Sequence, residues 1–268
     1  MEFLFSNYPP MKTTYKTFAD AFYGYIPESS QLDIAVGYVS SDALIELQKT
    51  IELNSNIKQV NLVIGMHYFD KFTKIQYDAA MHLNDFLNRE NLGEVRLVTT
   101  FRYHGKLYSY SNNGEPFVGI VGSNNLSSIV DGGIRVYESS ILLQEKDTLK
   151  QMKGFMDQLV RTSTTNIAKL PIETFNNENE LLEGQEYVEK VSSQELARIL
   201  NLKTDISFEI PIKTYEDSPH SNLNAFFGKG REGKNGLIKP RHWYEVELIV
   251  PKNVTSQKGY PHAKTEEA

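Results

Sequence analysis

The sequence predicts an α/β layered domain with a mostly parallel or mixed central sheet, followed by the start of a smaller β-rich domain. In residues 1–163, strand-like apolar runs alternate with amphipathic helix patterns, which is typical of a sheet covered by helices. After residue 200, short segments of alternating polar and apolar residues replace the helix patterns. We therefore expect a first domain at 1–163, a linker with short helices at 164–200, and a β-rich domain at 201–268.

The first domain is expected to contain strands at 32–39, 60–64, 95–99, 103–108, 116–121 and 136–143. Helices are predicted where apolar residues recur every three or four positions, and Ser40 and Ser41 can cap the first of them. The inward positions are Ala43, Leu44, Leu47 and Ile51 in the first helix, Ile75, Ala79, Leu83, Phe86 and Leu87 in the second, and Met152, Phe155, Met156 and Leu159 in the third.

The region after the first domain carries weaker signals. A short helix is predicted at 192–200, and alternating strands are predicted at 206–210 and 244–250. Two or three strands cannot form a stable domain alone, so we expect this β-rich domain to be incomplete at Ala268.

Composition sets limits on the class of protein. Hydrophobic residues make up 40% and charged residues 23% of the chain, which is ordinary for a globular protein, and no apolar run reaches the roughly 20 residues that span a membrane. The chain has no cysteine, which excludes disulfides, thiolate metal ligands and a cysteine nucleophile. We expect a cytoplasmic protein that does not bind membranes.

Positive charge is concentrated in one short segment, although the formal net charge of the chain is −6. This basic segment holds Lys229, Arg231, Lys234, Lys239 and Arg241, with Glu232 as its single carboxylate. A local excess of cations can bind DNA phosphates or base edges, and a solvated connection is the alternative interpretation.

Five polar residues near the ends of predicted strands suggest phosphodiester chemistry. In a strand, residues two apart share a face, so His104 and Lys106 should lie side by side as a nucleophile and a phosphate-binding cation. Ser123 and Asn125 follow Gly122 and can donate hydrogen bonds to phosphate oxygens. Glu138 opens the next strand and can orient the imidazole.

This pattern of His-x-Lys, then Gly-Ser-x-Asn, then Glu before an apolar strand resembles the phospholipase D superfamily, in particular its single-motif nucleases. The aspartate usual five residues after the motif lysine is replaced by Ser111. The segments 223–228 and 243–251 make the chain most similar to the NgoFVII-type restriction endonucleases. The resemblance implies a phospholipase-D-like nuclease domain followed by a B3-like pseudobarrel that reads a DNA sequence.

The resemblance also implies a mechanism. A single-motif chain must borrow a second histidine, so two chains would form a homodimer with one shared site. His104 of one chain would form a phosphohistidine and His104 of the other would act as general acid and base, with no metal and no cofactor. The expected substrate is double-stranded DNA, cut at or near a specific sequence. The sequence leaves open whether an ATPase partner subunit is needed, as in some relatives of this type.

Several alternatives compete with this hypothesis. The chain could be a DNA-binding module with a degenerate nuclease half, or an enzyme of the phospholipase D type that acts on another phosphodiester. Asp217, Glu232 and Lys234 loosely fit a metal-nuclease signature. The glycine-rich run 228–235 resembles phosphate-binding loops, but Pro240 and Gly236 forbid the helix that such loops require. The second His-x-Lys, at His262, is interpreted as chance, and His67 and His82 are interpreted as structural.

Overall fold

The computed structural model describes residues 1–130, 136–176, 192–202, 205–212, 214–215, 218–225, 230–233, 235–239 and 246–261. The chain divides into two compact units. The first unit comprises residues 1–186 together with 230–240, and the second unit comprises 187–229 and 241–268. Each unit is considered by itself.

An eight-stranded mixed sheet forms the centre of the first unit, in the order β1-β7-β6-β5-β2-β3-β4-β8. The strands are β1 (Glu2–Phe5), β2 (Gln31–Val36), β3 (Gln59–Ile64), β4 (Gly93–Val98), β5 (Leu107–Asn112), β6 (Glu115–Gly122), β7 (Ser139–Leu143) and β8 (Thr164–Asn166). Strands β2, β3 and β4 are parallel, and the other pairings are antiparallel. The predicted mixed α/β architecture is confirmed.

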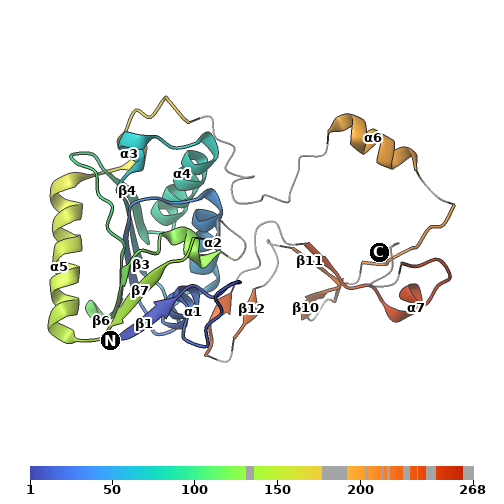
Figure 1. The fold of residues 1–268 in the computed structure, drawn as a ribbon, viewed down its shortest axis with the longest axis horizontal. Helices are drawn as coiled ribbons and strands as arrows, with labels where there is room; N and C mark the ends of the chain where they lie inside the picture. The colour runs from blue at the N-terminus through green and yellow to red at the C-terminus, as the bar shows by residue number, and fades with distance from the viewer. Residues whose placement is uncertain are drawn as a thin grey trace. The chain divides into compact units, whose positions relative to one another are not determined.

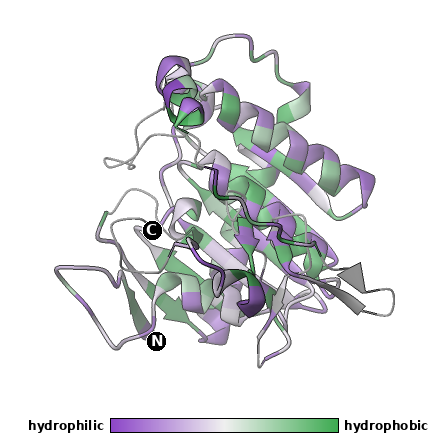
Figure 2. Ribbon diagram, turned by 90° about the vertical axis from the view of Figure 1, so that its right-hand side faces the viewer, coloured by the Kyte–Doolittle hydropathy of each residue, from purple (hydrophilic) through white to green (hydrophobic). Residues whose placement is uncertain are grey.

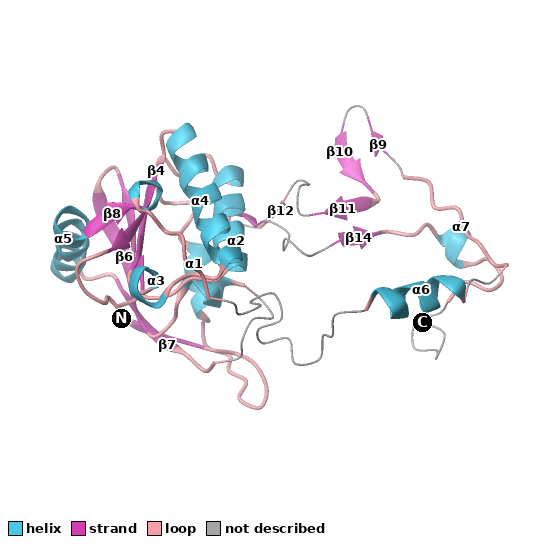
Figure 3. Cartoon of the chain, turned by 90° about the horizontal axis from the view of Figure 1, so that it is seen from above, coloured by secondary structure: helices cyan, strands magenta, loops and turns pink. Residues whose placement is uncertain are grey.

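Helices cover both faces of this sheet (Figure 1). On one face lie α1 (Phe18–Gly24), α2 (Ser41–Leu53) and α4 (Lys74–Arg89), and on the other lies α5 (Lys146–Ser163). The same layering is visible from above in Figure 3. Ser40 caps α2 as predicted, by accepting the Ala43 N–H, which satisfies one of the free donors at the helix start.

Most of the predicted apolar positions are buried in the core. In Figure 2, hydrophobic and hydrophilic residues alternate along the helices, as expected of amphipathic helices. Two predictions were wrong: Ile75 of α4 is 38% exposed and Phe155 of α5 is 48% exposed. The other predicted positions of α5, Met152, Met156 and Leu159, are buried against the sheet. A helix lying on a flat sheet buries only a narrow stripe, and position 155 falls at the edge of that stripe.

Two strand boundaries near the predicted site also differ from expectation. Strand β5 begins at Leu107 and β7 at Ser139, so His104, Lys106 and Glu138 lie in the connections before these strands. At the other edge of the sheet, β8 pairs with β4, so the first unit extends beyond residue 163. Alternation of side chains continues into an extended connection, and it therefore does not mark where strand pairing begins.

The second unit contains the predicted helix, α6 (Ser193–Asn201), which is capped by Ser192. Its strands pair as β9 (Thr214–Tyr215) with β10 (Ser218–Ser221) and β11 (Leu223–Ala225) with β14 (Val246–Leu248), and α7 spans Lys252–Thr255. The strand expected at 206–210 is absent from this described segment. There Phe208 packs against the Tyr260 ring, with centroids 5.1 Å apart, instead of facing a paired strand.

Residues 230–240 of the basic segment belong to the first unit, whereas the whole segment was expected within the β-rich domain at 201–268. The hairpin of β12 (Arg231–Glu232) and β13 (Ile238–Lys239) packs at the C-terminal end of α2. There the Asn54 side chain donates to the Ile238 carbonyl oxygen (2.8 Å) and accepts its N–H (3.0 Å). Leu237 is buried in the core of the first unit.

Candidate active site

The five predicted catalytic residues are brought to one end of the sheet by its topology. Strands β5, β6 and β7 run antiparallel to their neighbours, so the start of β5, the end of β6 and the start of β7 coincide. Leu107 therefore pairs with Val121, and Gly122 pairs with Ser140. The C-terminal ends of β1 and of the parallel strands β2, β3 and β4 lie at this same end, which we call the site end.

Lys106 and His104 contact each other directly at the site end. The Lys106 ammonium nitrogen Nζ lies 3.2 Å from Nδ1 and 3.1 Å from Nε2 of the exposed His104 ring. It also donates to the His104 carbonyl oxygen at 3.0 Å. Since an ammonium can only donate, its hydrogen bond to the ring needs an unprotonated ring nitrogen, which is the nucleophilic form of histidine.

Burial sets the electrostatics of Lys106, which is 7% exposed. Desolvation lowers the pKa of Lys106 from the ordinary lysine value, and the negative charge of Glu138 partly offsets this by raising it. No hydrogen bond joins Glu138 to His104 in the described part of the chain. The predicted role of Glu138 in orienting the imidazole stays a prediction, and its electrostatic effect falls on Lys106.

Gly105 of the His-Gly-Lys motif has a packing role. A Cβ atom at this position would lie 2.3 Å from the Tyr103 hydroxyl oxygen, so a larger residue would force the buried Tyr103 ring away. Burial raises the pKa of that tyrosine to about 12, so Tyr103 keeps its proton at neutral pH. The motif therefore needs glycine between its two functional side chains.

Asn125 is positioned by the neighbouring strand end. Its side-chain oxygen Oδ1 accepts the Tyr38 backbone N–H at 3.3 Å. Because a backbone N–H can only donate, the amide oxygen must face Tyr38, and the NH₂ group is directed elsewhere with both donors. This orientation suits Asn125 to bind a phosphate oxygen.

Ser123 is held in a different way. Its hydroxyl donates to the Ser139 carbonyl oxygen (3.2 Å) and accepts the Ser139 N–H (3.1 Å). The single hydroxyl proton is therefore used within the fold. The proposed donation from Ser123 to phosphate requires this bond to break, whereas the Asn125 donors are already oriented.

Sequence reasoning missed the residues that shape the Gly-Ser-x-Asn loop. The Asn124 side chain is buried, accepting from the Ser140 hydroxyl (2.6 Å) and donating to the Ser128 hydroxyl (3.1 Å). The Tyr108 hydroxyl donates to the Asn124 carbonyl oxygen at 2.9 Å. Asn124 carries no distinguishing signal in the sequence, since asparagine and serine favour tight turns whether or not their side chains bind a ligand.

Tyr38, Asp70 and Arg102 form a second group that was not predicted. The Tyr38 hydroxyl donates to Asp70 Oδ2 (2.6 Å), and Arg102 pairs with Asp70 Oδ1 (2.8 Å). The Tyr38 ring lies edge-on to the His104 ring, with centroids 5.6 Å apart. Tyr38 follows a buried parallel strand, and that position could have indicated a functional residue.

The other two histidines described in the first unit, His67 and His82, do not contact His104. His67 is buried, stacks on Phe72 with centroids 4.4 Å apart, and accepts the Val39 N–H. Burial lowers its pKa, so His67 stays neutral, as expected of a structural residue. His82 is exposed on α4.

Ser111, which replaces the usual aspartate, lies away from the site end. It is fully buried near the far end of β5, five residues after Lys106, or roughly 16 Å along an extended chain. The serine at this position therefore removes no group that could touch a phosphate bound at His104.

Among the proposed DNA-binding residues, only Lys239 has a described side chain. Lys229, Lys234 and Arg241 lie outside the described residues, and only the backbone of Arg231 is described. Lys239 Nζ lies over the Tyr23 ring, 4.8 Å from its centroid. The hairpin docks at Asn54, at the end of α2 opposite to the site end.

The residues of the metal-nuclease alternative are mostly not described. Asp217 and Lys234 lie outside the described ranges, as do His262 and Lys264, and Glu232 is exposed on β12. Within the described ranges, no three His, Asp or Glu side chains group closely enough to hold a metal ion. Among the same residues, no helix is both long and apolar enough to cross a membrane.

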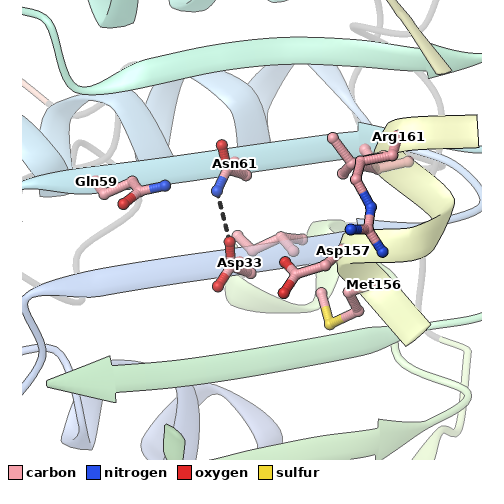
Figure 4. Close-up of a pocket in the computed structure, with 9 residues that line it drawn as sticks. Asp33, Gln59, Asn61, Met156, Asp157 and Arg161 are labelled. Atoms are coloured by element: carbon pink, nitrogen blue, oxygen red, sulfur yellow. Dashed lines mark hydrogen bonds between the residues drawn. The ribbon is translucent and has the colours of Figure 1, made fainter. Parts of the chain in front are cut away.

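A polar pocket of about 360 Å³ lies between the sheet and α5 (Figure 4). Within it, the buried Asp33 carboxylate accepts from Asn61 Nδ2 at 2.6 Å and from Gln31 Nε2, and it faces Lys153 Nζ at 3.6 Å. The pocket contains none of the predicted catalytic residues. Because neighbouring side chains already satisfy the Asp33 carboxylate, we interpret the lining of this pocket as a structural polar network.

Two models of known protein families match this chain. The model of the NgoFVII restriction endonuclease N-terminal PLD domain matches residues 16–173, and that of the NgoFVII C-terminal B3-like DNA-binding domain matches residues 198–267. Among curated proteins, no sequence matches the chain.

Solved structures with a similar fold have low sequence identity. Nuc, a phospholipase D family member from Salmonella typhimurium, is 11% identical, with a TM-score of 0.43 over 62% of this chain and 95% of its own. NucT from Helicobacter pylori is 12% identical, with a TM-score of 0.40 over 55% and 89%. A phosphatidylserine synthase from Haemophilus influenzae is 15% identical, with a TM-score of 0.41 over 74% and 45%. These weak likenesses do not define function, and the family assignment rests on the two domain models: the chain belongs to the NgoFVII restriction endonuclease family.

Proposed function

We propose that this nuclease cuts double-stranded DNA at or near a specific sequence, without a metal ion, through a phosphohistidine formed on His104. The observation that carries the proposal is the contact between the His104 ring and the buried Lys106 ammonium. This pair supplies a nucleophile and a fixed positive charge that are close enough to contact the same phosphate group. The second unit, which matches a B3-like DNA-binding domain from residue 198, would read the sequence.

The reaction has two displacements. An unprotonated His104 nitrogen attacks phosphorus, a P–N bond forms, and the bond from phosphorus to the leaving DNA oxygen breaks as a general acid protonates that oxygen. Water then attacks the phosphorus while a base takes its proton, the P–N bond breaks, and His104 is regenerated. Lys106 and Asn125 would stabilise the charge on the non-bridging oxygens.

The general acid and base would be His104 of a second copy, in a homodimer through the catalytic unit. Six exposed large apolar side chains, in the connections and in the short helix α3 (His67–Asp70) at the site end, support such an interface. They are Met11, Tyr15, Tyr68, Phe101, Val136 and Tyr137. Apolar side chains gathered on one surface favour association. Sedimentation should give a dimer, and a monomer that retains full cleavage activity would exclude the shared site.

Plasmid cleavage in excess EDTA tests the chemistry. Wild-type protein should cut in chelator, and His104→Ala should lose activity by at least about a thousandfold, since both nucleophile and acid are removed. His82→Ala, an exposed histidine on α4, is the matched control and should cut normally. Activity that vanishes with EDTA and returns with magnesium would favour the Asp217, Glu232 and Lys234 alternative. Cutting by the purified chain alone would show that no ATPase partner is required.

A degenerate nuclease half is the second candidate function, and one observation bears on it. The departure at Ser111 that motivated it lies in buried β5 and not at the site end. Binding of DNA without any cleavage by the wild-type dimer would nevertheless support this candidate.

A further inference from the structure

We propose that Tyr38 is a positioning residue that holds both the nucleophile His104 and the phosphate-binding Asn125 in reactive geometry. The inference rests on the proposed function of those two residues. Tyr38 immediately follows β2 and Gly37, at the site end of the sheet. Three separate parts of Tyr38 make three separate contacts, through its ring, its backbone N–H and its hydroxyl.

The Tyr38 ring is fixed between two histidines. It meets the His104 ring edge-on at 5.6 Å, and the buried His67 ring edge-on at 5.4 Å. His67 cannot give way, because it stacks on Phe72 and bonds to the backbone at Val39 and Lys71. The Tyr38 ring is thus held in one position, and the exposed His104 ring packs against it.

Gly37, the residue before Tyr38, allows the backbone at the end of β2 to lie close to His104. A Cβ atom on Gly37 would lie 2.8 Å from His104 Cδ2 and 3.3 Å from His104 Cα. Only glycine lets the end of β2 approach the nucleophile this closely. The backbone of residues 37–38 therefore restricts the rotamers that His104 can adopt.

The Tyr38 backbone N–H fixes the second reactive group. Its bond to Asn125 Oδ1 (3.3 Å) selects the amide orientation in which both N–H donors face away from β2. Any shift of the Tyr38 backbone would therefore change the nucleophile and the phosphate-binding amide together. Among the described residues, no other residue contacts both the His104 and the Asn125 side chains through a hydrogen bond or a ring contact.

The Tyr38 hydroxyl anchors the residue to a charged pair. It donates to Asp70 Oδ2 at 2.6 Å, and Arg102 holds the other oxygen of the same carboxylate at 2.8 Å. The hydrogen bonds from Tyr38 and Arg102 keep the pKa of Asp70 below its usual value, so the acceptor is ionised at neutral pH. Hydrogen bonds to a charged group are stronger than neutral ones, so this anchor fixes the tilt of the ring.

Two variants of Tyr38 separate the ring from the hydroxyl. Tyr38→Leu removes the aromatic ring that packs against His104. It should lower kcat about 10- to 100-fold and leave KM within about twofold of wild type, as expected when a reacting group is misplaced by roughly 1 Å. Tyr38→Phe keeps the ring but frees it from Asp70, and a smaller loss of kcat of about two- to tenfold is expected. Tyr25→Leu and Tyr25→Phe are matched controls, because Tyr25 is a half-buried tyrosine whose ring packs against Tyr110, near the end of β5 opposite to the site end.

A double-mutant cycle distinguishes positioning from general destabilisation. Asp70→Asn should lower kcat in the wild-type background, but it should have almost no further effect in Tyr38→Phe, since the anchor is already lost. The imidazole nitrogen signals of His104, measured by NMR, should broaden in Tyr38→Leu and stay unchanged in Tyr25→Leu. If Tyr38→Leu does not fold, Tyr38→Phe and the cycle still decide the question.

The outcomes also separate this inference from the proposed function. Full kcat in both Tyr38 variants, or additive effects of Asp70→Asn and Tyr38→Phe, would overturn the positioning role while His104→Ala remains inactive. Cleavage by His104→Ala would instead overturn the proposed nucleophile, whatever the Tyr38 variants do. Loss of kcat in the Tyr38 variants, with non-additivity at Asp70 and an inactive His104→Ala, would support both.

Discussion

The first unit has a lysine near each end of its sheet, and the two lysines differ in their surroundings. At the site end, Lys106 is buried and its ammonium touches the His104 ring. At the other end, Lys239 lies on the docked hairpin, over the Tyr23 ring. The 13 residues of α2 run between these ends, a distance of about 20 Å. The charge proposed to stabilise the reacting phosphate is therefore held inside the fold, and the charge proposed to hold DNA lies on the docked hairpin.

The largest effect is expected from removing the charge at the site end. Lys106→Met should lower the rate of cleavage of bound DNA about 10²- to 10³-fold, because a fixed cation no longer faces the reacting phosphate. Lys239→Met is the matched control and should leave this single-turnover rate nearly unchanged. Equal losses in the two variants would contradict the division between the ends.

The same substitution should not destabilise the protein. Burial lowers the pKa of Lys106, which means that the charged form is disfavoured in the folded state relative to the unfolded state. Between the folded and unfolded pKa values the unfolded chain binds more protons, so the wild-type protein gains stability as pH rises through that window. At neutral pH, Lys106→Met should unfold at a temperature no lower than wild type, by calorimetry.

Docking of the hairpin can be tested next. Asn54→Ala leaves the Ile238 N–H and carbonyl without their partner, and should lower the free energy of unfolding by about 1–3 kcal/mol. Gln48→Ala, on the same helix and bonded only to Glu52 in the described chain, should cost far less. Urea unfolding measures both, and equal stability of Asn54→Ala and wild type would argue against a docked hairpin.

Glu138 should tune the site end through Lys106. Because its charge raises the pKa of Lys106, Glu138→Gln should lower that pKa further. The fall of cleavage rate at high pH should then begin at a lower pH than in wild type. A pH profile of single-turnover cleavage checks this, and an alkaline limb that moves to higher pH would be inconsistent with it.

Much of the first unit could be predicted from sequence, because period and burial are local signals. The strands around Ile34 and Leu62, the cap at Ser40 and the motif residues His104 and Asn125 all follow from short windows. Contacts between distant segments could not be predicted in this way. Neither the role of Tyr38, which depends on residues 67, 70, 104 and 125, nor the docking of residues 230–239 on Asn54 has a local signature.

Strand ends were predicted less well than strands. The segment 103–106 has the alternation of a strand, yet strand pairing begins only at Leu107. His104 and Lys106 still lie together, since the Lys106 ammonium nitrogen is 3.1 Å from the nearer ring nitrogen of His104. The motif therefore predicted that the two side chains lie together, although the element that carries them was assigned wrongly.

The smallest single effect is expected from Lys239, at the hairpin end. Each cation that contacts a DNA phosphate contributes roughly one unit to the slope of log affinity against log salt. Replacing Arg231, Lys234, Lys239 and Arg241 together by glutamine should therefore flatten this slope by several units, while the cleavage rate of fully bound DNA stays within about twofold. Lys239→Gln alone should change the slope by one unit or less. Its ammonium already lies over the Tyr23 ring, and it must leave that contact to reach a phosphate. Binding titrations at several salt concentrations measure both variants, with His82→Ala as the control. Should the fourfold variant bind DNA with unchanged affinity and slope, the hairpin would serve only to connect the two units in sequence. The cations that hold DNA would then have to lie in the second unit, and the separation between the two ends would hold for catalysis alone.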